Sequence, residues 1–386
     1  MNEQWIQFAN EIKKMYGKDV VPLHEPTFDE KEIEYVTECI KTGWVSSVGS
    51  YVTRFEEELA KFVGAKRAVA VVNGTAALHI ALKIVGVEEN DEVLMPSLTF
   101  VATANAASYL GAIPHFVDVS YETLGMDPIK LNKHLEEIGV LRNGKLYNKQ
   151  TGRRIAAVVP MHTFGHPVDL DRLLEVCDKF NLVLVEDAAE SLGSYYKGRH
   201  TGSFGKVSAI SFNGNKIITT GGGGAIITND EHLADYAKHL TTTAKIPHLW
   251  EYVHDEIGYN YRMPNINAAL GLAQLEKLPQ LIENKRKLTL KYDKLVSNLD
   301  DVKLIMENIN SKSNYWLQTL ILGNSYDIND VLNYLNNNGI ISRPVWTPIH
   351  KLSMYINCPK ADLSITESLK NKLLNIPSTP LNFKES

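Results

Sequence analysis

The stretch SAISFNGNKIITTGGGGAIIT, residues 208–228, places one lysine between two apolar runs. VSAISFN and GAIITND are predicted to be strands, because β-branched and apolar residues fill them and turn-forming residues bound them. Lys216 follows the first strand in a loop of Asn and Gly. Such a lysine is either a solvated loop side chain, which is the common case, or an amine that forms a Schiff base with a carbonyl compound.

Strand and helix patterns alternate on both sides of this stretch, from about residue 65 onward. Strands are expected at RAVAVVN, DEVLMPS, AIPHFVDV, IAAVVPMH and LVLVEDAA, and helices at GTAALHIALKIVG, FVATANAASYLG and DLDRLLEVCDKFN. Apolar strands that alternate with helices are typical of an α/β fold with a mostly parallel sheet covered on both faces.

The two ends of the chain have patterns of their own. Residues 3–16 have the apolar spacing of an amphipathic helix, and a long helical pattern covers roughly residues 265–298. The sequence after it is predicted to be a strand (NYWLQTLIL), a helix (INDVLNYLNNNG) and a strand (IISRPVW). We therefore expect an N-terminal helical extension (1–20), a large domain (21–264), and a linking helix with a smaller C-terminal α/β domain (265–386).

Composition excludes several classes of function. The 386 residues carry a formal charge of −5, and an acidic balance disfavours nucleic acid and anionic membranes as partners. No apolar run is long enough for a membrane span, and the N-terminus lacks the apolar core of a signal peptide. The three cysteines lack metal-binding spacing. We expect a cytoplasmic protein without a metal site.

Two further stretches fall at predicted strand ends, where open α/β sheets bind ligands. In VVNGTAALH a helix begins at Gly74 and Thr75, and helix N-termini bind phosphate; Thr75 could instead be a simple cap. In LVLVEDAAESLGS, Asp187 is either a cap or the partner of a cation. Neither a P-loop nor a dinucleotide fingerprint is present. An anion site, a carboxylate and a lysine together match the needs of pyridoxal phosphate.

The stretches NGTAALHIAL, PSLTFVATANA, VEDAAESLGS, GSFGKVSAISFNGNKIITTGGGGAIIT and GYNYRMPNINAALGLAQLEKL resemble the DegT-type nucleotide-sugar aminotransferases. These are pyridoxal-phosphate enzymes of fold type I and are usually homodimers. The resemblance extends from about residue 22 to the C-terminus. GWVSSVGSYVTRFE and SFNGNK…GGGG most resemble the branch that makes 4-amino sugars for legionaminic acid and bacillosamine-type bacterial surface glycans.

The resemblance implies a set of site residues. Lys216 corresponds to the lysine that binds the cofactor aldehyde, and Asp187 to the acid on the pyridine nitrogen. The implied cofactor contacts are Gly74, Thr75, Ala76, Phe100, Asp187, Glu190, Ser211, Lys216 and Asn260, the last of these from the partner subunit of a homodimer with shared active sites. Glu190 departs from the frequent His or Gln, and Gly222 replaces the acid of the common GEGG.

Substrate contacts are expected at Ser46, Ser47, His162, Arg343 and His350. Arg343 suits phosphate oxygens. For each histidine the alternative is a hydrogen-bonded structural role, and for Arg343 too a structural role is the alternative.

The resemblance implies a ping-pong transfer of an amino group. L-Glutamate would donate it, leaving 2-oxoglutarate, to the 4-keto carbon of a UDP- or GDP-linked 6-deoxy-4-keto-N-acetylhexosamine. The alternatives are amination at C3 and a non-catalytic regulatory homologue of the same fold. A sugar 3-dehydratase of this family would carry histidine in place of Lys216.

Overall fold

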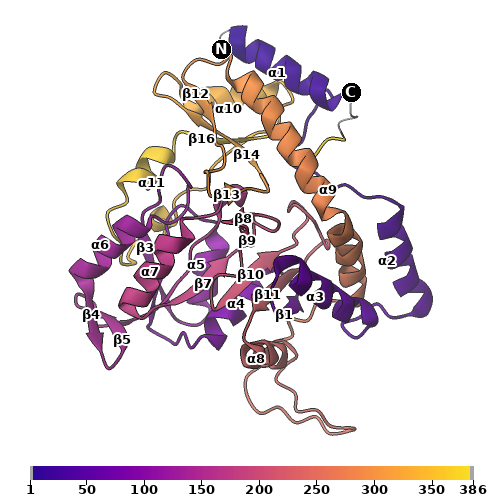
Figure 1. Cartoon of the computed structure of the whole chain (residues 1–386), viewed down its shortest axis with the longest axis vertical. Coiled ribbons are helices and arrows are strands. Elements are labelled where there is room, and N and C mark those ends of the chain that lie inside the picture. Colours follow the sequence, from indigo (N-terminus) through magenta and orange to yellow (C-terminus); the bar gives the residue numbers. More distant parts are fainter. Residues whose placement is uncertain (1–2, 383–386) are drawn as a thin grey trace.

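A nine-stranded mixed sheet forms the centre of the molecule (Figure 1). The structure is a computed structural model that describes residues 3–382. Strand order is β1-β11-β10-β7-β6-β2-β3, with the β4–β5 hairpin added beside β6. Their bounds are β1 Arg67–Val71, β2 Glu92–Pro96, β3 Ile113–Val117, β4 Gly139–Arg142, β5 Lys145–Asn148, β6 Arg154–Val158, β7 Val183–Asp187, β10 Val207–Ser211 and β11 Gly224–Thr228.

The five strands from β10 to β3 run parallel, whereas β11 is antiparallel to both β1 and β10. This arrangement confirms the predicted α/β class with a mostly parallel, mixed sheet. The central strands β2, β7 and β11 are buried along almost their whole length because helices cover both faces.

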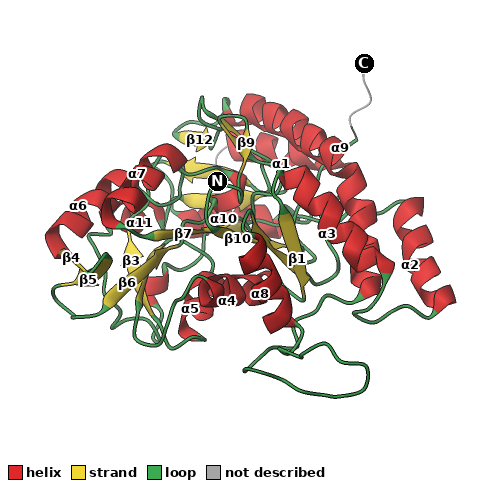
Figure 2. Cartoon of the chain, turned by 60° about the horizontal axis from the view of Figure 1, so that its bottom comes forward, coloured by secondary structure: helices red, strands yellow, loops and turns green. Residues whose placement is uncertain are grey.

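Two layers of helices enclose the sheet, as Figure 2 shows with α4, α5 and α8 below it and α3, α6, α7 and α9 above. The lower layer packs on apolar side chains of β1, β2, β10 and β11. The upper layer forms separate clusters under α3 and α9 and under α6 and α7. The bounds are α3 Ser50–Val63, α4 Gly74–Ile84, α5 Val101–Ser108, α6 Pro128–Ile138, α7 Leu170–Phe180, α8 Glu231–Thr241 and α9 Asn265–Val296.

A second sheet, of order β12-β14-β16-β15, lies beside the C-terminal half of α9. Its core also contains Trp5, Phe8 and Ile12, so the N-terminal helix α1 packs on this second sheet (top of Figure 1). The predicted helix over residues 3–16 is confirmed. The bounds are α1 Glu3–Tyr16, β12 Val302–Leu304, β14 Gln318–Leu322, α10 Ile328–Asn337, β15 Arg343–Pro344 and β16 Leu373–Ile376.

Two strand predictions in this region were too long. The strand expected over NYWLQTLIL begins only at Gln318, because Asn314 and Trp316 bond to loops of the large domain instead of a sheet ladder. The strand expected over IISRPVW is reduced to Arg343–Pro344.

The sequence patterns did not predict α3, α6, α8, β4, β5, β12 and β16. The remaining elements that they did not predict are α2 Glu30–Thr42, the three-stranded sheet of β8 Tyr195–Tyr196, β9 Arg199–His200 and β13 Ser311–Lys312, the single turns η1 Thr163–Gly165 and η2 Ile349–Lys351, and α11 Ser364–Leu369. Helix α2 begins at a capping box in which Asp29 accepts from the first turn and Glu32 reaches back to the Asp29 N–H.

Part of the C-terminal region returns to the large domain. Ile349, Tyr355 and Leu363 lie in the apolar cluster of α4 and α5, and Lys360 bridges to Phe116 of β3. Within residues 3–382, no helix combines the length and apolar character that crossing a membrane requires.

The loop between α8 and α9, residues 242–264, projects from the body of the protein (Figures 1 and 2). Its exposed apolar side chains include Leu249 at 89%, Trp250 at 72% and Ile257 at 81% of full exposure.

Candidate active site

A cavity of about 280 Å³ lies at the carboxyl ends of β1, β7 and β10. Large-domain strand ends and loops form its floor, and two tryptophans from the small-domain side form part of its wall. The lining residues are Asn73, Gly74, Thr75, Leu78, Phe100, Ala102, Met161, Asp187, Ala189, Glu190, Ser211, Asn213, Asn215, Lys216, Trp316 and Trp346. Seven of the residues implied by the family resemblance therefore meet in one cavity: Gly74, Thr75, Phe100, Asp187, Glu190, Ser211 and Lys216.

Lys216 lies inside this cavity and is not a solvated loop lysine. Its side chain is 13% exposed, and its Nζ lies 3.3 Å from Oε1 of Glu190. The same Nζ lies 3.9 Å from the centroid of the Trp316 ring. A buried amine beside a carboxyl group suits nucleophilic attack on a carbonyl followed by proton transfer.

Asp187 ends β7 and is almost completely buried. Its Oδ2 accepts from the Thr103 hydroxyl at 2.7 Å, and its Oδ1 accepts from the Ala189 N–H at 3.2 Å. Burial raises the pKa of Asp187, although the Thr103 hydrogen bond and the charge of Lys216 oppose the rise. Among the residues that the structure describes, no cationic nitrogen forms an ion pair with this carboxylate. A buried carboxylate in this state favours a cationic partner.

Glu190 is the second buried carboxyl group of the cavity. Burial raises the pKa of Glu190 to about 7, against the opposing charge of Lys216 and the N–H of Phe164. That N–H donates to Oε2 at 2.9 Å, from a residue in the left-handed region at φ 55°. A carboxyl group that titrates near neutrality beside Lys216 is suited to proton transfer.

The N-terminus of α4 and Ser211 form the polar end of the cavity. A Cβ at Gly74 would lie 2.9 Å from the Ser211 Cβ, so only glycine allows this close approach. Asn73 caps the helix by accepting from the Ala76 N–H at 2.8 Å. The helix dipole and the neighbouring Ser211 and Thr75 hydroxyls make this end a site for a phosphate group.

These residues fit pyridoxal phosphate. Asp187 lacks a cationic partner that a protonated ring nitrogen would supply, the α4 N-terminus suits a phosphate, and Lys216 suits an aldehyde. The glycine run after Lys216 also requires glycine at particular positions. Gly221 has φ +79°, and a Cβ at Gly223 would lie 2.1 Å from Thr220 Oγ1. At Gly222, where the common family motif has an acid, the nearest atom to a Cβ is 3.9 Å away.

The remaining cofactor residues implied by the resemblance do not line the cavity. Ala76 is buried, and its N–H is already bonded to Asn73. Asn260 is exposed, and its Oδ1 accepts from Arg262 at 3.3 Å. The implied contact of Asn260 with a partner subunit's cofactor remains a prediction.

The two histidines expected near the sugar have hydrogen-bond partners within the chain. His162 is fully buried, and its Nε2 lies 3.0 Å from Oε2 of Glu186. His350 lies 2.7 Å from the Ser97 hydroxyl and 2.8 Å from Oε1 of Glu367. Neither histidine is among the residues that line the cavity, and their expected contacts with the sugar remain predictions.

The other expected substrate residues also lie outside the cavity. Arg343 is exposed and donates to Asn336 Oδ1 at 3.2 Å. Ser46 accepts the Asn265 N–H at 2.7 Å through its carbonyl, at the start of α9, and Ser47 is its half-buried neighbour. Their expected contacts with substrate remain predictions.

Sequence reasoning missed four residues that shape the site: Thr103, Phe164, Trp316 and Trp346. Phe164 lies between the two tryptophans, with ring centroids 5.0 Å from Trp346 and 6.4 Å from Trp316. Thr103 follows Phe100 by three residues, and this helical spacing was the one available signal. The aromatic residues come from distant parts of the chain and carry no local signal.

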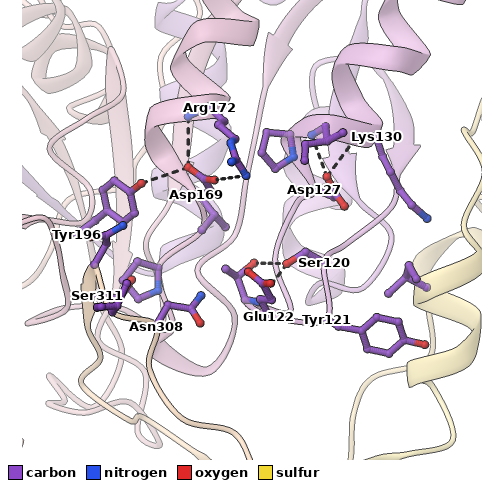
Figure 3. A pocket seen from close by; sticks show the side chains of 18 residues that line it. Ser120, Tyr121, Glu122, Asp127, Lys130, Asp169, Arg172, Tyr196, Asn308 and Ser311 are labelled. Carbon is purple, nitrogen blue, oxygen red and sulfur yellow. Dashed lines mark hydrogen bonds and ion pairs between the residues drawn. The ribbon is translucent and has the colours of Figure 1, made fainter.

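A larger cavity, of about 690 Å³, lies elsewhere between β3, α6, α7 and β13 (Figure 3). Among its lining residues Arg172 pairs with Asp169 at 3.4 Å, and Lys130 pairs with Asp118 and Asp362, which lie outside the lining. The Lys130 side chain is 32% exposed, whereas Lys216 is 13% exposed and shares its cavity with the buried Asp187 and Glu190, so the smaller cavity is the candidate active site.

Comparison with known proteins gives the same answer as the geometry. Residues 26–386 match the DegT/DnrJ/EryC1/StrS aminotransferase family. The chain is 40% identical over 343 residues to the aminotransferase EpsN of Bacillus subtilis, covering 89% of this chain and 84% of EpsN. It is 38% identical over 360 residues to GDP-perosamine synthase of Escherichia coli O157:H7, covering 93% of each protein.

The fold also matches solved structures. The aminotransferase TlmJ from Streptoalloteichus hindustanus superposes with a TM-score of 0.83 at 28% identity, over 93% of both chains. Helicobacter pylori PseC, an aminotransferase involved in the biosynthesis of pseudoaminic acid, gives a TM-score of 0.82 at 25% identity over 93% of both chains.

Proposed function

Because the chain belongs to the DegT/DnrJ/EryC1/StrS aminotransferase family and is a pyridoxal-phosphate-dependent nucleotide-sugar aminotransferase, we propose that it aminates the 4-keto carbon of a nucleotide-linked 6-deoxy-4-keto-N-acetylhexosamine. L-Glutamate is the proposed donor and 2-oxoglutarate the by-product. The observation that carries this proposal is the meeting of Lys216, Asp187 and the α4 N-terminus in one cavity.

The chain's own residues have distinct tasks in this reaction. Lys216 would hold the cofactor aldehyde, and its amine would act as base and then as acid in moving a proton. Asp187 would hold a proton on the ring nitrogen through its buried carboxylate, to which Thr103 donates a hydrogen bond. The bound cofactor supplies an electron sink for the charge that develops at the donor α-carbon. Glu190, 3.3 Å from Lys216 Nζ, can accept or return that lysine's proton.

Relatives named GDP-perosamine synthase support a 4-amino product, and a relative named spore coat polysaccharide biosynthesis protein SpsC supports a role in surface polysaccharides. We accordingly propose 4-amino sugars of the legionaminic acid or bacillosamine type as products. The sugar C3 is the alternative position of amination.

The first measurement is the visible absorbance of the purified protein with pyridoxal phosphate, before and after L-glutamate. Loss of the violet-region band on addition of glutamate is expected. The loaded enzyme is then offered UDP- and GDP-linked 4-keto sugars, with mass spectrometry to detect the amine and NMR to locate it at C4 or C3. Lys216→Ala should abolish turnover, whereas Lys61→Ala, at a side chain 80% exposed on α3, should not. Substantial turnover by Lys216→Ala would refute the assignment.

We also propose a homodimer in which the loop of residues 242–264 lies against the partner. Contact with a partner would bury the loop's exposed Leu249, Trp250 and Ile257. Asn260, in the same loop, lies outside the cavity of its own chain. Asn260→Ala and Lys216→Ala proteins are each expected to be impaired. Refolding the two together should restore activity, since one site of each hybrid then has both residues. No recovery in verified hybrids would contradict shared sites.

A further inference from the structure

Trp316 is held by three hydrogen bonds that belong to three different segments. Its backbone N–H donates to Asn314 Oδ1 at 2.8 Å, and its carbonyl accepts from Lys285 Nζ at 3.0 Å. Its indole N–H donates to the carbonyl of Asn215 at 2.7 Å. The side chain, 4% exposed, is thus fixed in one orientation between the domains.

The hydrogen bond from the Trp316 indole N–H ends on Asn215, the residue immediately before Lys216. The loop from Asn213 to Lys216 has no regular secondary structure. Within it, the Lys216 N–H donates to the Asn213 carbonyl, and the Asn213 side chain donates to the Asn215 side chain. The Trp316 indole therefore adds an anchor from outside the loop. The same ring covers Lys216 Nζ, with 3.9 Å between the nitrogen and the ring centroid.

Lys285 holds Trp316 from the opposite side. This lysine of α9 is fully buried, and its Nζ donates to two main-chain carbonyls, those of Trp316 and Ser378. Burial lowers the pKa of Lys285 well below its usual value. Asn314, which accepts the Trp316 N–H, also donates to the carbonyl of Glu190. The segment 314–316 thus connects α9 to both loops that carry the lysine and its carboxyl neighbour.

We propose that Trp316 is a positioning residue for Lys216, which fixes the backbone before the lysine through the indole N–H and shields its amine with the ring. The proposal rests on the assignment of Lys216 as the reactive lysine of the proposed function. It gives the segment after α9 a direct part in the placement of that amine, because Trp316 is also anchored on α9 through Lys285.

The test compares Trp316→Phe, which keeps a ring but loses the N–H, with Trp316→Leu, which loses both. The full chain without added cofactor is labelled briefly with an amine-reactive ester, and Lys216 labelling is measured by peptide mass spectrometry relative to Lys61. Trp5→Phe is the matched control, since it makes the same chemical change at a buried tryptophan of the small-domain core. In parallel, kcat and KM are measured on the loaded enzymes.

In Trp316→Leu, Lys216 labelling is expected to rise about thirtyfold, the fold-change that corresponds to the ~2 kcal/mol of one desolvated cation–ring contact. Trp316→Phe should show a smaller rise that reports loss of the bond to Asn215, and Trp5→Phe none. The fall in activity should lie in kcat, with KM changed little. Wild-type labelling in both Trp316 variants would overturn the proposal, and so would an effect confined to KM, which would make Trp316 a wall of the substrate space. Because labelling needs no sugar, failure of the proposed reaction would leave this result interpretable.

Discussion

The hydroxyl of Thr103 donates a hydrogen bond of 2.7 Å to Oδ2 of Asp187, across 84 positions of the chain. Thr103 lies on α5, which follows β2, and Asp187 ends β7; β6 separates the two strands in the sheet. The bond stabilises the ionised form of a carboxyl group whose pKa burial raises. Thr103 therefore helps to keep Asp187 able to hold a proton on a cofactor nitrogen.

Thr103→Val should lower turnover about tenfold, because a hydrogen bond to a charged group contributes about 1.5–3 kcal/mol. The pKa of Asp187 should rise further without this donor, so that less of the bound cofactor is protonated on its ring nitrogen. Steady-state kinetics and an absorbance titration with pyridoxal phosphate measure both effects. Thr103→Ser keeps the hydroxyl and is the control; equal activity of the Val and Ser variants would contradict the role.

Glu190 should make the stability of the unloaded protein depend on pH. Its pKa rises from the usual 4.5 to about 7 in the folded protein, so the folded state binds more protons between these values. The free energy of unfolding should then fall as pH rises across that window, by up to about 3 kcal/mol, and become level above it.

Glu190→Gln carries no such proton and should lack this fall. Urea denaturation at pH 5 and pH 8 measures this. The free energy of unfolding of Glu190→Gln, relative to that of the wild type, should be higher at pH 8 than at pH 5. Glu58→Gln, at a side chain 54% exposed on α3, is the control without the effect. Parallel pH profiles for Glu190→Gln and wild type would rule out the assigned titration.

Gly74→Ala should weaken cofactor binding more than it weakens the fold. The new methyl group would push against Ser211 Cβ, 2.9 Å away, and open the phosphate end of the cavity. Loss of one charge-assisted hydrogen bond there should raise the dissociation constant of pyridoxal phosphate roughly tenfold or more. Gly214→Ala, which meets no atom within 4 Å, is the control. Unchanged affinity in Gly74→Ala would show that this close approach does not shape the binding site.

Phe8→Ala should destabilise the small domain. Phe8 is almost completely buried, with its ring 5.4 Å from Trp5 and 6.4 Å from Tyr292. Truncation of a buried aromatic ring costs about 3–5 kcal/mol, which chemical denaturation would measure. Ile6→Ala, on the same helix at a half-exposed side chain, should change stability little. Equal stabilities for the two variants would mean that α1 does not contribute to this core.

Local patterns were sufficient for most of the central sheet. Seven of its nine strands were predicted, together with α4, α5 and α7, because strand and helix periodicities depend on neighbouring residues alone; α3, α6, α8 and the β4–β5 hairpin were not predicted. Lys216, Asp187 and Gly74 were expected at one edge of the sheet for a related reason, and all three line one cavity. Parallel strands bring their carboxyl ends to one edge, so a polar residue just past a strand is already placed by sequence.

The same reasoning was less reliable where a residue's partners are distant. His162 lies just after β6, much as Asp187 lies at the end of β7. The ring of His162 is nevertheless buried and pairs with Glu186. The strand expected to begin at Asn314 begins four residues later, because the segment before it serves the site. Side-chain direction at a strand end depends on the packing beneath it, which no local pattern records.

By itself the sequence determined an α/β fold and a cavity with a lysine, a carboxylate and an anion site at one edge of a sheet. Only the tertiary structure decided what holds that lysine and that carboxylate: Trp316 from the small domain for the loop before Lys216, and Thr103 from a neighbouring helix for Asp187. The physical reason is that strand and helix propensities act between neighbours in the chain, whereas these hydrogen bonds join residues 101 and 84 positions apart, which the order of the strands and the packing of the domains bring together.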